Sequence, residues 1–280
     1  MDLSRLYQPL TATPFQNDVH YRERPPRHAL LRPWIRCLWG GCAGSSPAPH
    51  PVIPDTCSDI ILRIDRHTGQ VRSDYCALSD ETFFSSSAQD PRVELFAVRF
   101  YAWAAPAFMQ DSLFGALNGF FDAREHFPAL VRALLQMLKE TDGFAQRCEK
   151  AECILLSHLN PSAIRPEILN ATADLLQSRG SIRVSELAAH NQLSQRQLER
   201  LFDEYTGASH KKLADLIRYQ FLWREAVSSP AFDVQDAVFR YGYADQSHLL
   251  RHFRRYHGMG LTEAVRFARV GFVQDSRVVR

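Results

Sequence analysis

Apolar positions in the C-terminal third of the chain recur at helical spacing. A stripe at i, i+3, i+4 and i+7 predicts one amphipathic helix: Leu198, Leu201, Phe202 and Tyr205. Ser194 and Gln197 have the spacing of a capping box, so we expect this helix to begin there, and Gly207 is typical of its end. A short apolar pattern at residues 184–188 predicts a preceding helix. Two helices joined by a tight turn form a helix-turn-helix unit, whose second helix can enter a DNA major groove.

The same pattern returns 51 positions downstream. A short helix is predicted at residues 234–241, and a second amphipathic helix between Asp245 and Gly258. Five pairs of identical residues share the offset: Leu198 and Leu249, Arg200 and Arg251, Phe202 and Phe253, Tyr205 and Tyr256, Gly207 and Gly258. Residues 209–228 contain no Gly or Pro and predict one connecting helix of about 30 Å. Successive major-groove faces of B-DNA lie roughly 34 Å apart, so one chain can read two adjacent grooves.

The N-terminal half has a different pattern. Extended runs are predicted at Ile60–Asp65, Val71–Ala77 and Val93–Phe100, the first two separated by a turn at residues 67–70. After Pro106 the apolar spacing becomes helical, most clearly at residues 130–138. Strands followed by helices predict an α+β N-terminal domain, a small barrel or sandwich with helices against it. The C-terminal part is predicted to be an all-α domain, in which a long helix joins the two helix-turn-helix units.

Proline and charge divide the chain at a similar place. Fourteen of the 15 prolines lie at or before Pro166. The formal net charge is −2 over residues 1–180 (18 Lys and Arg against 20 Asp and Glu) and +4 over residues 181–280 (15 against 11). A basic C-terminal part is typical of a phosphate-binding module. We expect a sensor or dimerisation domain at 1–156, a linker at 157–166, a DNA-binding domain at 167–269 and a tail at 270–280.

The sequence predicts no membrane contact. Its longest apolar run, Leu95–Met109, is interrupted by Arg99 and falls short of the roughly 18 residues of a spanning helix. The N-terminal residues lack the basic leader and apolar segment of a secretory signal. We therefore expect a soluble, cytoplasmic protein.

Two stretches carry a family resemblance, LSQRQLERLFDEYTG in the first copy and YGYADQSHLLRHFRRYHGMG in the second. With the connecting helix they resemble the DNA-binding domain of the AraC/XylS family of bacterial transcription regulators, over residues 167–269. The second stretch is similar to the family signature G-[FY]-x-[DS]-x-[SQ]-x-[FL]-x-R-x-F-[KR]-x-x-x-G. It departs at HGMGL, which lacks the family's usual proline after the glycine turn. The resemblance implies a sequence-specific regulator that binds double-stranded promoter DNA, contacts RNA polymerase if it activates, and takes no cofactor.

Three N-terminal stretches, PWIRCLW, PDTCSDII and VRFYAWAA, resemble an uncharacterised cupin-like sensor domain that is often attached to AraC-type helices. Thr56 stands where that domain usually has glycine. The resemblance implies that the N-terminal domain binds a small-molecule effector or forms a homodimer.

The outer face of each second helix supplies candidate DNA contacts. Arginine pairs with guanine, glutamine with adenine, and glutamate accepts from cytosine. The candidates are Ser194, Gln195, Arg196, Glu199 and Arg200 in the first copy, and Gln246, Ser247, His248, Leu250, Arg251, Arg254 and Arg255 in the second. Arg254 and Arg255, with His210, Lys211 and Lys212, are candidates for phosphates, which position a protein without reading sequence. The alternative is a solvated face with ordinary i,i+4 Glu–Arg pairs.

An effector pocket is expected at residues 54–59 and 98–103, since ligand sites are commonly apolar pockets with a few convergent polar groups. The candidate ligand residues are Cys57, Asp59, Arg99, Tyr101 and Trp103. The alternative is a closed, packed barrel that only dimerises.

The sequence favours neither a metal site nor an enzyme. Four cysteines have the spacing C-x4-C-x14-C-x18-C, which lacks the paired C-x2-C of zinc sites: Cys37, Cys42, Cys57 and Cys76. The familiar catalytic motifs are absent, and the aspartates Asp55, Asp59 and Asp65 are of a kind more common in turns than in carboxylate pairs. The alternative function is a DNA-targeted enzyme, such as a cysteine-dependent alkyl-acceptor repair protein with a regulatory tail, in which Cys57 is the candidate nucleophile.

Overall fold

The computed structural model describes residues 2–10, 21–42, 50–85, 92–109 and 112–275. The side chain of Cys42 and residues 276–280 of the expected tail lie outside the described part. Within the described part, no helix is both long and apolar enough to cross a membrane.

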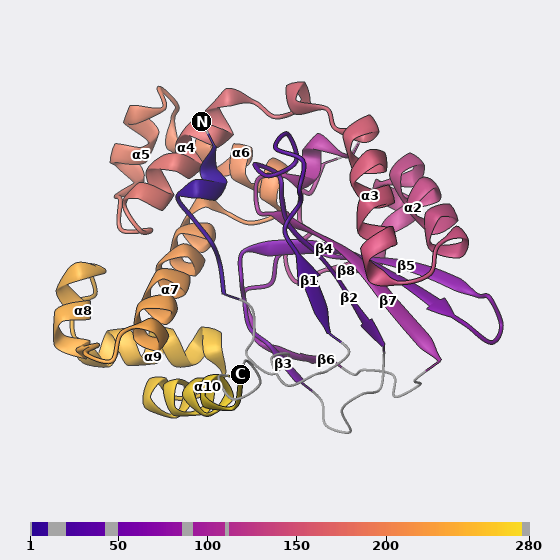
Figure 1. The fold of residues 1–280 in the computed structure, drawn as a ribbon. Helices are drawn as coiled ribbons and strands as arrows, with labels where there is room; N and C mark the ends of the chain where they lie inside the picture. The colour runs from indigo at the N-terminus through magenta and orange to yellow at the C-terminus, as the bar shows by residue number, and fades with distance from the viewer. Residues whose placement is uncertain (1, 11–20, 43–49, 86–91, 110–111, 276–280) are drawn as a thin grey trace.

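A six-stranded antiparallel sheet forms the centre of the N-terminal domain (Figure 1). Its strands are, in spatial order, β1 (Arg22–Arg24), β2 (Ile35–Cys42), β7 (Val93–Tyr101), β4 (Cys57–Asp65), β5 (Val71–Cys76) and β8 (Phe120–Asp122). A separate ribbon pairs β3 (His50–Val52) with β6 (Phe83–Ser85). The three strands predicted from the sequence are β4, β5 and β7, and β4 pairs with both of the others.

Two helices cover one face of this sheet, as Figure 1 shows. They are α2 (Pro128–Glu140) and α3 (Phe144–His158), preceded by the short α1 (Ala123–His126). Phe96, Val98 and Phe100 alternate along β7 and are fully buried beneath them. The ring of Phe96 lies 6.2 Å from that of Phe144. The predicted apolar face of β7 is therefore the core face.

The apolar pattern did not predict β2 and α3. In β2, two glycines interrupt the pattern, and a Cβ at Gly40 would lie 2.8 Å from the Leu95 carbonyl oxygen. In α3, the buried face includes Arg147 and Glu152, so it is not an apolar stripe. Arg147 pairs with Glu94 at 2.6 Å, which explains how a charged residue is accommodated there.

Seven helices occupy the described residues from Pro166 onward. They are α4 (Pro166–Gln177), α5 (Val184–His190), α6 (Gln195–Thr206), α7 (His210–Ser228), α8 (Val234–Arg240), α9 (Gln246–His257) and α10 (Leu261–Asp275). The all-α architecture expected for this part is confirmed, and α10 runs beyond residue 269. Three single-turn 3-10 helices complete the described structure: η1 (Leu3–Arg5), η3 (Ala105–Ala107) and η4 (Pro161–Ala163).

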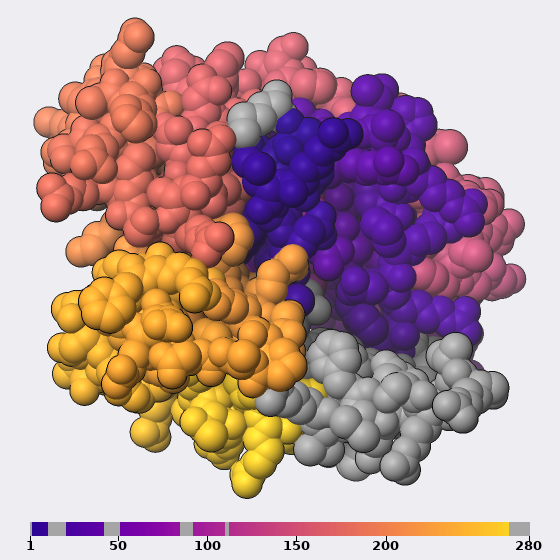
Figure 2. Space-filling view, turned by 60° about the vertical axis from the view of Figure 1, so that its left-hand side comes forward, coloured from indigo at the N-terminus to yellow at the C-terminus, as the bar shows by residue number. Residues whose placement is uncertain are grey.

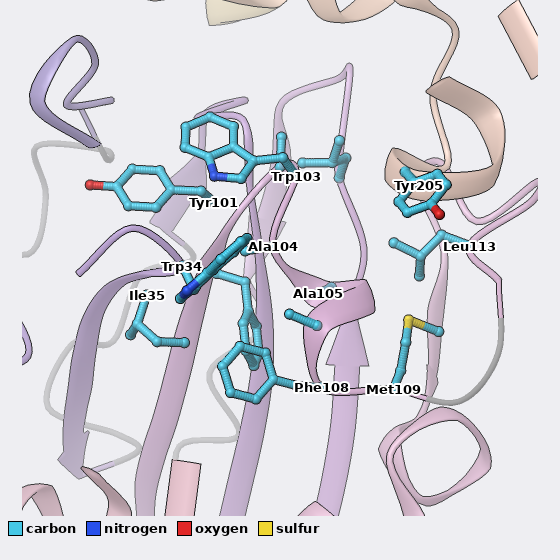
Figure 3. Packing of buried hydrophobic residues seen from close by; sticks show 14 of the residues in the cluster. Trp34, Ile35, Tyr101, Trp103, Ala104, Ala105, Phe108, Met109, Leu113 and Tyr205 are labelled. Atoms are coloured by element: carbon cyan, nitrogen blue, oxygen red, sulfur yellow. The ribbon is translucent and has the colours of Figure 1, made fainter. Parts of the chain in front are cut away.

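Two hydrophobic cores hold the molecule together. The first runs without interruption from the sheet into α4, α5, α6 and the start of α7, and the second joins the rest of α7 to α8, α9, α10 and Ile53 of the N-terminal domain. Figure 3 shows Met109 and Leu113 of the N-terminal domain beside Tyr205 of α6. In Figure 2 the N-terminal residues lie between the helical part and the sheet. The two parts of the chain are thus closely packed.

Candidate nucleic-acid interface

Helices α5 and α6 form the first predicted helix-turn-helix unit. Ser194 caps α6, accepting from the Gln197 amide at 3.2 Å, while the Gln197 side chain accepts from the Ser194 amide at 2.9 Å. The helix ends at Gly207, whose φ of 71° is left-handed. Both ends of α6 therefore lie where the sequence predicts.

The candidate residues of α6 lie on its solvent face. The side chains at 194–197, 199 and 200 are exposed, whereas Leu198, Leu201 and Phe202 are buried. Within the part of the chain that the structure describes, Arg196 and Arg200 form no ion pair. Both guanidinium groups can therefore donate to a base or a phosphate.

Helices α8 and α9 form the second unit. Asp245 caps α9 by accepting from the His248 amide at 2.7 Å, and Gly258 ends it with a φ of 79°. Six candidates are exposed on α9: Gln246, Ser247, Leu250, Arg251, Arg254 and Arg255. The remaining candidate, His248, is half-buried, and its ring lies 5.4 Å from that of Tyr243 at 86°. His248 thus packs against its own unit.

Helix α7 joins the two units and also binds the N-terminal domain. Gln220, near its middle, is only 2% exposed. Its side-chain amide donates to the carbonyl oxygens of Leu10 at 3.1 Å and Pro54 at 2.6 Å and accepts from the Leu10 amide at 2.8 Å. Sequence reasoning missed this residue, because a glutamine on a helix gives no sign of partners 210 positions away.

The end of α6 also contacts the N-terminal domain. The Leu113 amide donates to the Glu204 carbonyl at 3.0 Å, and the Tyr205 hydroxyl donates at 3.2 Å to the carbonyl of Ala163, in the connecting segment before α4. A Cβ at Gly207 would lie 2.9 Å from the Leu113 carbonyl oxygen. The first unit is therefore fixed to the N-terminal domain at the end opposite its capped N-terminus.

The five candidate ligand residues lie together and are buried. The register of β4 and β7 places Asp59 opposite Arg99 and Cys57 opposite Tyr101, and Trp103 stacks on Tyr101 at 4.8 Å. Burial raises the pKa of the Cys57 thiol, which keeps it protonated and poorly nucleophilic.

Arg99 binds two carboxylates in this cluster. Its Nε and Nη2 donate to the two oxygens of Asp59, each at 3.0 Å, and its Nη1 lies 3.1 Å from Asp55 Oδ2. Trp39 Nε1 also donates to Asp59, at 2.7 Å. The polar atoms of Asp59 and Arg99 are thus paired within the protein, and the effector site stays a prediction.

A cavity of about 330 Å³ opens elsewhere, between β5 and helices α1 and α2. It is lined by Val71, Arg124, Pro128, Arg132, Leu135, Gln136 and Lys139, none of them a candidate ligand residue. Among the described residues, no group of three or more His, Cys, Asp or Glu side chains is placed to hold a metal ion.

His257, at the end of α9, gives a prediction for pH dependence. Its ring lies 4.7 Å from Phe253 and 4.4 Å from Trp223, and burial lowers its pKa to about 4. Below pH 6.5 the unfolded chain binds a proton that the folded chain takes up only near pH 4, so stability falls as pH falls through this window. By about pH 5 we expect a loss of about 2 kcal/mol from this group.

Urea unfolding at several pH values measures this loss, and NMR titration of the imidazole measures the pKa directly. A His257→Phe variant keeps the apolar ring and should lose this part of the pH dependence. An imidazole that titrates near its ordinary value would contradict the prediction.

Two family descriptions match parts of the sequence. Residues 187–266 match a family described as "Helix-turn-helix domain", and residues 22–118 match one described as "Domain of unknown function (DUF6597)". The first match spans α6 to α9, and the second spans most of the sheet. A comparison with curated proteins finds no match.

Solved structures of ToxT from Vibrio cholerae show a distant similarity. An apo form of a variant from strain SCE256 is 8% identical with a TM-score of 0.42, over 86% of this chain and 98% of that one. The O395 protein bound to (E)-4-(8-methylnaphthalen-1-yl)but-3-enoic acid is 8% identical with a TM-score of 0.42, over 89% and 99%. Another O395 structure is 10% identical with a TM-score of 0.38, over 89% and 96%.

Proposed function

We propose that this chain is a DNA-binding transcription regulator with an AraC-type helix-turn-helix domain at its C-terminus, and that α6 and α9 enter adjacent major grooves of one promoter. One observation carries this proposal: each helix begins with a side-chain cap, buries Leu, Phe and Tyr at matching positions and ends at a left-handed glycine, with arginines on its exposed face. Helix α7, with 19 residues, spans about 28 Å between them.

The proposed domain division follows the sequence: 1–156 senses or dimerises, 157–166 connects, 167–269 binds DNA, and 270–280 forms the tail. The connection is ordered, since the Asn160 amide donates to the Ala107 carbonyl at 2.8 Å. We further propose a small-molecule effector in the N-terminal domain, and contact with RNA polymerase if the protein activates. The ligands in ToxT structures belong to that protein; the effector here is proposed from the sequence pattern at residues 54–59 and 98–103, although Asp59 and Arg99 pair with each other in this structure.

Arg200 and Arg254 should contribute differently to DNA binding. Arg200 lies beside Gln195 and Arg196 on the exposed face of α6, where base edges are the expected partners. Arg200→Ala should cost about 1–3 kcal/mol of binding free energy on the preferred DNA site and relax the preference at one base pair of that site. Arg254→Ala should weaken binding to all DNA and reduce the salt slope by about one unit.

The test begins with selection of binding sites from a random duplex library by the purified full-length protein. Titrations at several salt concentrations then compare the selected site with random DNA. Arg132→Ala, an exposed arginine on α2, is the matched control and should change neither affinity. Equal losses on both DNAs for Arg200→Ala would show that α6 does not read bases. Failure to select any site would contradict the proposed function.

A further inference from the structure

One carboxylate of the N-terminal domain contacts both the connecting helix α7 and the second helix-turn-helix unit. Asp80, between β5 and β6, is only 4% exposed, and its Oδ2 pairs with the ammonium group of Lys212. The same oxygen lies 3.9 Å from a guanidinium nitrogen of Arg255. Lys212 is in the first turn of α7, directly after the first unit, and Arg255 is in the last turn of α9. Asp80 therefore contacts one cation directly after the first unit and a second cation at the end of the second unit.

Asp80 is held in a fixed position. Its Oδ1 accepts from the Asn118 side-chain amide at 2.7 Å, and its backbone amide donates to the Asn118 side-chain oxygen at 2.9 Å. Burial raises the pKa of Asp80, but hydrogen bonds from Lys212 and Asn118 outweigh that effect and leave the pKa below its ordinary value. The carboxylate is thus charged at neutral pH and cannot swing away without breaking the Asn118 contacts.

The segment around Asp80 also contacts the end of α9. The Thr82 hydroxyl donates to the Tyr256 carbonyl oxygen at 2.6 Å. The Thr82 methyl group lies 3.6 Å from the position of a Cβ on Gly258. A neutral hydrogen bond and a van der Waals contact thus accompany the ionic contacts of Asp80.

We propose that Asp80 occupies the place of a DNA phosphate for Lys212 and Arg255, so that the N-terminal domain and DNA compete for these two cations. This inference rests on the proposed function and adds a means of regulating it. A lysine paired with a buried carboxylate cannot at the same time neutralise a phosphate and release its counterion. The conformation described here is therefore the weaker DNA binder, and withdrawal of residues 79–82 strengthens binding.

Asp80→Asn tests the competition, because it removes the charge and keeps the size of the side chain. The probe is a random-sequence DNA duplex long enough to span two successive major-groove turns. We expect the variant to bind it about threefold to tenfold more tightly and with a salt slope steeper by about one to two units. Asp142→Asn is the control, since it changes net charge equally at an exposed carboxylate that pairs with Arg66. Equal binding by the two variants would overturn the proposal.

Two further measurements separate this mechanism from loosened structure. In a Lys212→Gln background, Asp80→Asn should give a smaller gain in affinity, because the principal released cation is gone. In the unaltered protein, the backbone amides of residues 79–82 should exchange hydrogen faster when the duplex is bound. This measurement tests the competition even if Asp80→Asn fails to fold. Unchanged exchange on DNA would refute the competition while leaving the proposed function intact. Failure of the unaltered protein to bind any duplex would refute both.

Discussion

Replacing Arg99 by methionine is expected to lower the free energy of unfolding by about 3–5 kcal/mol, because Asp55 and Asp59 would remain buried without their counter-ion. All three side chains are buried, and Arg99 lies within 3.1 Å of both carboxylates. Methionine is similar in length and apolar, so the substitution chiefly removes the charge and its hydrogen bonds. Urea unfolding of the full chain measures the loss.

The size of this loss should depend on pH. Burial raises the pKa of Asp55 to about 6, while the charge of Arg99 lowers it. Without Arg99 the pKa of Asp55 rises further above its value in the unfolded chain. As pH falls, protonation of Asp55 therefore removes an unpaired buried charge from the folded state. The destabilisation should therefore shrink between about pH 7 and pH 5.

Arg63→Met is the matched control for this substitution. Arg63 lies on β4 and pairs with Asp74, but its side chain is 35% exposed. Partly exposed ion pairs contribute little, so we expect a loss below about 1 kcal/mol. Similar losses for the two arginine variants would show that the buried cluster tolerates uncompensated charge.

Gly180→Ala is expected to destabilise the protein by about 3 kcal/mol, the sum of a backbone and a steric effect. Gly180 follows α4 with a φ of 75°, a left-handed conformation that L side chains rarely adopt. A Cβ there would lie 2.1 Å from the Ala214 carbonyl oxygen of α7. The Gly180 carbonyl also accepts from Arg218 at 2.7 Å, so α4 and α7 cannot separate without losing that bond.

Gly69→Ala isolates the backbone effect. Gly69 has a similar φ of 70°, but a Cβ there would meet nothing within 4 Å. We expect it to cost about 1 kcal/mol, so the difference between the two alanine variants measures the steric term. Thermal unfolding of both variants provides the comparison. Equal losses would mean that α7 shifts freely to accept the methyl group.

Local patterns predicted the DNA-binding units well, since caps and glycines act over a few residues. The box at Ser194 and Gln197, the cap at Asp245 and the left-handed glycines all appear where expected. The strand at Ile60–Asp65 was equally clear, because β-branched residues have strong strand preference. The sequence does not predict strands β1, β3, β6 and β8, because three residues are too few to show an alternating pattern.

Long-range polar contacts could not be predicted in the same way. Asp80 and Lys212 are 132 positions apart, and neither stands in a distinctive motif. The sequence predicts Arg99 and Asp59 as ligand residues, but in the structure these polar groups converge on each other. A sequence read alone shows which groups are charged; their partners depend on how the sheet and α7 are packed.

The continuous core between the sheet and α6 limits where the N-terminal domain can be replaced by recombination. Recombination at residue 166 would join α4–α10 to a foreign N-terminal domain and leave Tyr205 and the surface near Gly207 uncovered, because Leu113 and Ala116 now cover them. The second unit would keep its own core around Phe253 but lose the buried contact of Ile53 and the contacts of Asp80 and Thr82 with α9. A viable chimera must therefore keep Leu113 and Ala116 together with α6, so that these contacts are inherited as one block.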